Sequence, residues 1–150
     1  MEKFMSTILL AVVMFCGGMA VAVQPSINAR LAERLGGVLE SATISFAVGA
    51  MALLLIAFLA GKGSFKAALS APLWELTGGF LGALFVTLFI IAVPRIGTAA
   101  AMGAAIGGQL TTGILLDYYG LFGVTPIPLD LKRLIGTLLL IAGAALILRH

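Results

Sequence analysis

The sequence contains very little charge. Only 10% of its 150 residues are Asp, Glu, Lys or Arg, whereas a soluble domain carries about 25%. Hydrophobic residues make up 61% of the chain, and the mean hydropathy is +1.19. So few polar side chains cannot cover a soluble surface, and the composition therefore excludes an ordinary soluble domain.

Cysteine and histidine are almost absent. The single cysteine, Cys16, lies inside an apolar run, and the single histidine, His150, is the last residue. A disulfide framework, a CxxC metal site, haem ligation and a catalytic triad each need residues that the chain does not supply. A net charge of +3, scattered along the sequence, also argues against a nucleic-acid-binding face. We therefore expect no cofactor, no metal, no nucleic-acid partner and no enzymatic activity.

Long uncharged runs dominate the sequence. Four of the five reach or exceed the roughly 18 apolar residues that cross a bilayer. The last run is shorter, but Lys132, Arg133 and Arg149 flank it and can extend to the lipid headgroups. The runs cover residues 4–29, 41–61, 76–94, 96–116 and 134–148. We predict an all-α integral membrane protein with five transmembrane helices.

The expected helices form a single transmembrane domain over residues 1–150 and are joined by short loops. Their predicted ranges are about 4–35, 38–60, 73–93, 96–116 and 131–148. We expect a tight turn at Pro94-Arg95 between the third and fourth helices. Asp130 is expected to be the N-cap of the last helix.

The first helix is longer than one crossing requires. A helix from Phe4 to Leu35 would extend about 48 Å, against a hydrocarbon core of roughly 30 Å. We expect a kink at Pro25 or a strong tilt, and an end at Gly36-Gly37. Lys3, the apolar stretch and Ala20-Val21-Ala22 also fit a cleaved secretory signal, and the intact mass of the purified protein separates these alternatives.

Short residue patterns along the whole chain resemble the YdcZ-like family, a half-size branch of the drug/metabolite transporter superfamily. Each pattern is built from common membrane residues, but their order and spacing through all five expected helices are fairly specific. The patterns are Gln24-Pro25 with Asn28, Trp74 with Gly78-Gly79 and Gly82-Ala83, Pro94-Arg95-Ile96-Gly97-Thr98, Gly108-Gln109-Leu110, Asp117, and Arg133-Leu134-Ile135-Gly136.

The resemblance implies a bacterial inner-membrane transporter that assembles as an antiparallel homodimer with ten helices. It implies no particular substrate. Five helices are few for enclosing a polar route, and two inverted copies would supply an inverted-repeat arrangement. The expected function is secondary transport of a small solute by alternating access, with proton-coupled export as a further possibility. A passive channel and a membrane scaffold without a solute remain as alternatives.

Small and polar residues on the helices divide into packing and pathway candidates. Gly78 and Gly82, and likewise Gly103 and Gly107, have the GxxxG spacing of close helix packing. Gln109 is an intramembrane amide that needs a partner, either a neighbouring backbone or a transport cavity.

Four further polar residues are pathway candidates. Gln24 and Asn28 flank Pro25, which frees backbone carbonyls in the way that discontinuous transporter helices do; capping a kink is the alternative. Glu40 is the first candidate for ion coupling, because a carboxylate near the membrane is costly unless it is paired or protonated. Its alternative is an ion pair with Arg30 or Arg34. Asp117 is either a pathway residue or one that orders a helix end.

The positive charges are nearly balanced between the two sides of the membrane on which the helix ends are expected to lie. Because Lys and Arg in short loops set orientation, a difference of one charge determines the insertion direction only weakly. The nine cations divide into Lys3, Lys62, Lys66, Lys132 and Arg133 on the amino-terminal side, and Arg30, Arg34, Arg95 and Arg149 on the other.

We predict that the chain inserts into the membrane in both orientations. Reporters fused to the carboxyl terminus, one active only inside the cell and one only outside, should both be active at comparable levels. Activity of one reporter alone would show a single orientation that is set by features other than the cation count.

Overall fold

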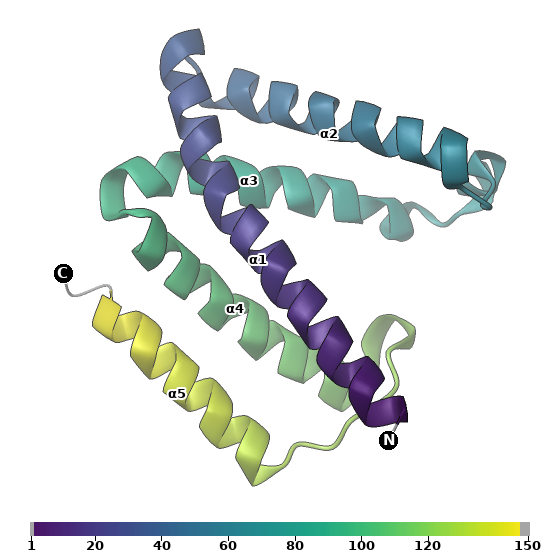
Figure 1. Cartoon of the computed structure of the whole chain (residues 1–150), viewed down its shortest axis with the longest axis vertical. Coiled ribbons are helices and arrows are strands. Elements are labelled where there is room, and N and C mark those ends of the chain that lie inside the picture. Colours follow the sequence, from purple (N-terminus) through teal and green to yellow (C-terminus); the bar gives the residue numbers. More distant parts are fainter. Residues whose placement is uncertain (1, 148–150) are drawn as a thin grey trace. The chain divides into compact units, whose positions relative to one another are not determined.

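The computed structural model describes residues 2–147 of the chain, with side chains from Met5 onward. The regular elements over this range are all helices (Figure 1). Their order is α1 (Glu2–Leu35), α2 (Val38–Ala60), η1 (Phe65–Ser70), η2 (Leu73–Leu76), α3 (Thr77–Ile96), α4 (Thr98–Tyr119), η3 (Leu121–Gly123) and α5 (Leu131–Ile147). The predicted all-α class is confirmed.

The chain divides into two compact units. The first ends at Pro94 and holds α1, α2 and nearly all of α3, while the second begins at Arg95 and holds α4 and α5. The prediction of one transmembrane domain over the full length stays a prediction.

α1 and α2 form a hairpin whose close contact lies near the turn (Figure 1). Gly36 adopts a left-handed φ of 71°, which an L side chain rarely takes, and so lets the chain reverse. Ser41 is fully buried, and its Oγ donates a hydrogen bond of 2.7 Å to the backbone carbonyl of Asn28. The small neighbours Ala29 and Ala42 are buried as well. Small side chains and one hydroxyl therefore join the two helices.

α3 contacts the hairpin through large side chains. A Cβ added at Gly82 would lie 3.5 Å from the ring of Phe46 on α2. Phe89 and Ile90 keep only 5% and 2% of their surface exposed. Gly78, by contrast, has no side chain within 4 Å of an added Cβ. The contact with α2 is thus at Gly82 and not at Gly78.

The tight turn that was expected at Pro94-Arg95 lies elsewhere. α3 continues through Pro94 and Arg95 to Ile96, and Gly97, with a φ of 81°, separates it from α4. Proline removes one backbone hydrogen bond from a helix, but its φ is helical, and α3 continues for two residues beyond Pro94. The expected turn was wrong by two residues, because the glycine and not the proline ends the helix. α1 likewise runs through Pro25 as one helix, and the kink expected there stays a prediction.

In the second unit α4 and α5 lie side by side and run in opposite directions (Figure 1). A Cβ added at Gly103 would lie 3.1 Å from Cβ of Ala144, and one added at Gly107 would lie 3.7 Å from Cγ1 of Ile141. Glycine at these positions lets the two backbones approach closely, as in GxxxG contacts between membrane helices.

Four helical segments are long and apolar enough to cross a membrane: Met5–Leu35, Val38–Ala60, Leu73–Ile96 and Thr98–Tyr119. The described part of α5 has 17 residues, or about 25 Å of helix, so the fifth crossing stays a prediction. Large apolar side chains along α1 and α2 are exposed, including Phe15 at 71% and Phe58 at 88%. Surfaces of this kind face lipid or another protein chain.

Two glycines on α4 provide a matched test of this packing. Gly103→Ala should destabilise the protein by roughly 1–3 kcal/mol, because the added methyl group meets α5. Gly108→Ala should be neutral or stabilising by up to about 1 kcal/mol, since nothing lies within 4 Å of its added Cβ. Thermal unfolding in detergent measures both, and equal effects would argue against the contact between α4 and α5.

Candidate functional site

A buried amide lies at the middle of the first unit. Asn28 of α1 is 4% exposed, and its Nδ2 is buried without a hydrogen-bond partner among the described residues. Its backbone carbonyl accepts the bond from Ser41, but its side chain takes no part in that bond. A buried donor without a partner costs free energy, so this amide needs an explanation.

Pro25, three residues before Asn28, is also buried. Proline has no backbone N–H, and the carbonyl four residues earlier therefore loses its helical donor. That carbonyl belongs to Val21. Val21 and Asn28 are seven residues apart, which places them on one face of the helix. The Val21 carbonyl, without its usual donor, and the Asn28 amide nitrogen, without an acceptor, thus lie within two turns of the helix.

A small cavity is lined by residues of this part of α1 together with residues of α3. It is lined by Val21, Gln24, Pro25, Asn28, Phe85, Val86 and Phe89. Its volume is about 10 Å³, close to the minimum that holds one water molecule. We call this cavity the Asn28 notch. The rings of Phe85 and Phe89 stand edge to face with centroids 4.7 Å apart, so one wall of the notch is aromatic.

Gln24 and Asn28, the two candidates of the first helix, therefore line one cavity. Asn28 is buried there, whereas Gln24 is exposed. Phe85 and Phe89 were not predicted as part of a site. Their spacing of four residues indicates a shared helix face, but their position against α1 depends on contacts between helices that are distant in sequence.

Glu40 lies in the first turn of α2 and is exposed. A Cβ added at Gly37, the residue before the helix, would overlap the Glu40 carboxylate. An acidic group at this position is favoured by the helix dipole. Among the described residues Glu40 forms no salt bridge with Arg30 or Arg34. It does directly precede Ser41, whose hydroxyl binds the backbone of Asn28.

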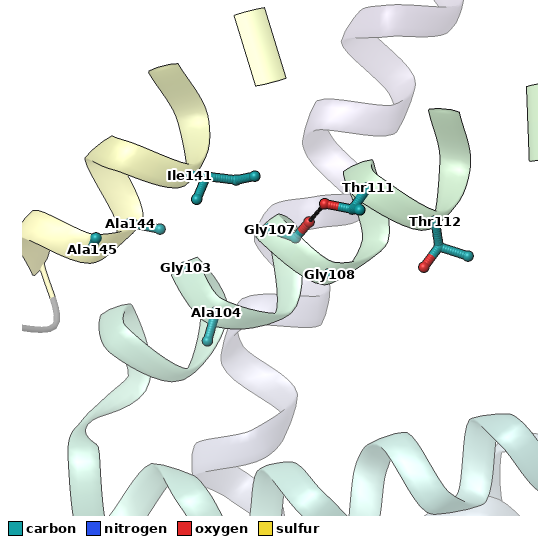
Figure 2. Close-up of a pocket in the computed structure, with 9 residues that line it drawn as sticks. All are labelled: Gly103, Ala104, Gly107, Gly108, Thr111, Thr112, Ile141, Ala144 and Ala145. Carbon is teal, nitrogen blue, oxygen red and sulfur yellow. Dashed lines mark hydrogen bonds between the residues drawn. The ribbon is translucent and has the colours of Figure 1, made fainter. Parts of the chain in front are cut away.

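A larger groove lies between α4 and α5 in the second unit. It has a volume of about 450 Å³, and Figure 2 shows Ile141 and Ala144 facing the glycines of α4. Thr111 donates a hydrogen bond of 2.8 Å to the carbonyl of Gly107 within the same helix. Gln109 is exposed and is not one of the residues that line this groove. The groove walls are Gly103, Ala104, Gly107, Gly108, Thr111, Thr112, Ile141, Ala144 and Ala145.

Asp117 lies near the end of α4 and forms a salt bridge with Arg133 of α5. The two side chains are 27% and 29% exposed. The backbone carbonyl of Asp117 also accepts a hydrogen bond of 2.9 Å from the amide of Ile127. Asp130 accepts the amide of Arg133 at 2.7 Å, which is the geometry of a helix N-cap. In the described structure these bonds hold the loop between α4 and α5 at both of its ends.

The fold and its polar groups define a multi-pass helical membrane protein. Polar groups are set into apolar helices, as they are in membrane proteins that move solutes. The chain belongs to the YdcZ family, since a family model described as "Putative inner membrane exporter, YdcZ" matches residues 9–146. The family is thus described as one of exporters, and the chain is an inner membrane protein.

One curated relative is the inner membrane protein YdcZ of Escherichia coli (strain K12). It is 26% identical over 141 residues, which cover 91% of this chain and 93% of the relative. No solved structure matches the chain significantly.

The salt bridge between Asp117 and Arg133 can be tested by a double-mutant cycle. Asp117→Asn and Arg133→Gln should each lower stability, and the pair should couple by about 0.2–1 kcal/mol, the range for partly exposed ion pairs. Unfolding in detergent measures the three variants. Strictly additive losses would show that the two side chains do not interact.

Proposed function

We propose that the chain is a secondary transporter that exports a small solute by alternating access. The observation that carries this proposal is the Asn28 notch, where Nδ2 of Asn28 is buried without a hydrogen-bond partner among the described residues and Pro25 removes the helical donor of the Val21 carbonyl. Unpaired polar groups in a membrane are costly and usually serve a function. A solute that passes through could pair with them temporarily. Membership of an exporter family supports the direction of transport.

The transporting unit in this proposal is an antiparallel homodimer with ten helices. Two inverted copies related by an axis in the membrane plane would place equivalent halves around a central site. The nearly equal cation count on the two sides supports insertion in both directions. The exposed apolar side chains of α1 and α2 supply surface for a second copy as well as for lipid.

Glu40 is the proposed site of proton coupling. It is an exposed carboxylate in the first turn of α2. Its neighbour Ser41 donates a hydrogen bond to the backbone carbonyl of Asn28, so Ser41 connects Glu40 to a residue of the notch. Gaining or losing a proton there would change the charge at the junction of α1 and α2. Movement of that junction would alter access to the notch.

The other two candidates have separate roles in the proposal. Gln109 is an exposed amide on α4 and would contact the solute along the route. Asp117 is engaged with Arg133. We therefore assign it to ordering the loop before α5 and not to the pathway.

Flux assays in liposomes test this function. Candidate solutes should show saturable transport, and Glu40→Gln should abolish its dependence on a proton gradient and lower the rate about tenfold or more. Glu33→Gln is the matched control, because Glu33 is an exposed carboxylate on α1, outside the predicted pathway. It should transport like the unmodified protein.

Other outcomes separate the alternatives. Conductance without saturation or counterflow would indicate a channel. No movement of any solute, together with unchanged growth phenotypes of Glu40→Gln, would rule out the transporter. Equal loss in both glutamate variants would remove the specific role of Glu40.

A further inference from the structure

The chemical character of the Asn28 notch restricts what it can bind. Nδ2 of Asn28 offers a hydrogen, and the carbonyl of Val21 lacks its helical donor because of Pro25. A hydroxyl group both donates and accepts, so it can pair with both kinds of group, and Val21 and Asn28 line the same small cavity. An ether or a thioether can accept but not donate, and an ammonium group can donate but not accept.

Charge and size narrow the choice further. The seven residues that line the notch carry no charged side chain, and an ion buried there would lack a counter-ion. The volume of about 10 Å³ admits one oxygen-sized group and no larger body. Phe85 and Phe89 form the adjoining wall, against which an apolar or aromatic part of a solute can pack once the rings move apart.

We infer that Asn28 and the carbonyl of Val21 form a subsite for the hydroxyl group of a neutral solute whose apolar part packs against Phe85 and Phe89. This inference rests on the proposed transport function and adds the class of substrate to it. The subsite selects uncharged alcohols over charged or purely apolar molecules of the same shape. In the described structure the notch beside the two rings has room for a single oxygen-sized group.

A series of four benzene derivatives of similar shape tests the inference. Benzyl alcohol, toluene, benzylammonium and benzoate differ in the one group that would enter the notch. Each is titrated into purified full-length protein in detergent, and Kd is obtained from the shift in the unfolding midpoint, followed through the fluorescence of Trp74. Benzyl alcohol should bind about five- to tenfold more tightly than toluene, the effect of a net hydrogen bond. The two ions should bind more weakly than benzyl alcohol.

Two variants remove the two hydrogen-bonding groups separately. Asn28→Ala removes the donor, and Pro25→Ala restores a backbone N–H that occupies the carbonyl of Val21. Each should reduce the preference for benzyl alcohol over toluene to about twofold or less. Pro25→Ala is informative even if Asn28→Ala folds poorly, because a proline removed from a helix interior should not destabilise the helix.

Two controls separate binding from structure. Ser41→Ala loosens the contact between α1 and α2 but keeps the amide of Asn28, and it should retain the preference. Pro94→Ala removes a helical proline outside the notch and should also retain it. Loss of the preference in either control would overturn the inference, because it would show a general effect on packing.

The remaining results decide between the subsite and the transport function. Equal affinity for benzyl alcohol and toluene would mean that the notch holds only water, and tightest binding of an ion would contradict a neutral substrate; either result overturns the inference. Saturable transport of ions that is unaffected by Asn28→Ala would also overturn it, although the transporter would stand. Selective binding of benzyl alcohol without any flux would support the subsite and refute the transport function.

Discussion

Inside a bilayer, every backbone N–H and C=O has to find its hydrogen-bond partner within the protein, because the lipid offers none. This requirement makes the chain helical over most of its described length, with side chains that are mostly apolar and exposed. Each group that lacks such a partner is an exception that needs an explanation. Where a helix contains a proline or an amide without a partner, the cost has to be offset by water, by a neighbouring chain or by a solute.

Apart from Pro94 near the end of α3, the exceptions described in the first unit are concentrated at one place. Pro25 and Asn28 lie on α1, Ser41 joins that segment to α2, and the Phe85–Phe89 pair of α3 closes the notch. The Ser41 hydrogen bond and the aromatic pair therefore surround the Asn28 amide and the Val21 carbonyl, whose own hydrogen bonds are incomplete. In the second unit the polar contacts of Asp117, Asp130 and Arg133 instead hold a loop and a helix start. Nη1 of Arg133 is also buried without a hydrogen-bond partner among the described residues, although Nη2 is paired with Asp117.

Long uncharged runs made the helical class predictable from the sequence, since few other structures can place so many apolar residues in a membrane. Asp is a preferred N-cap residue, so Asp130 was predicted to cap the last helix. The structure confirms this cap. Pro94 misled the prediction, because α3 continues past it to Ile96 and Gly97 provides the turn. The position of Phe85 and Phe89 in the notch, and the pairing of Asp117 with Arg133, depend on which helices pack against each other. The helical period of the sequence does not contain that information.

Water access to the notch tests the central claim most directly. Alternating access requires that position 28, a buried position at the end of the uncharged run of α1, meets water. Asn28→Cys in a Cys16→Ala background should react with a membrane-impermeant thiol reagent in intact vesicles, whereas Leu54→Cys on the exposed apolar side of α2 should not. Reaction at position 28 alone is the predicted result. Protection at position 28 equal to that at position 54, under all solute and proton gradients, would contradict a transport pathway through α1.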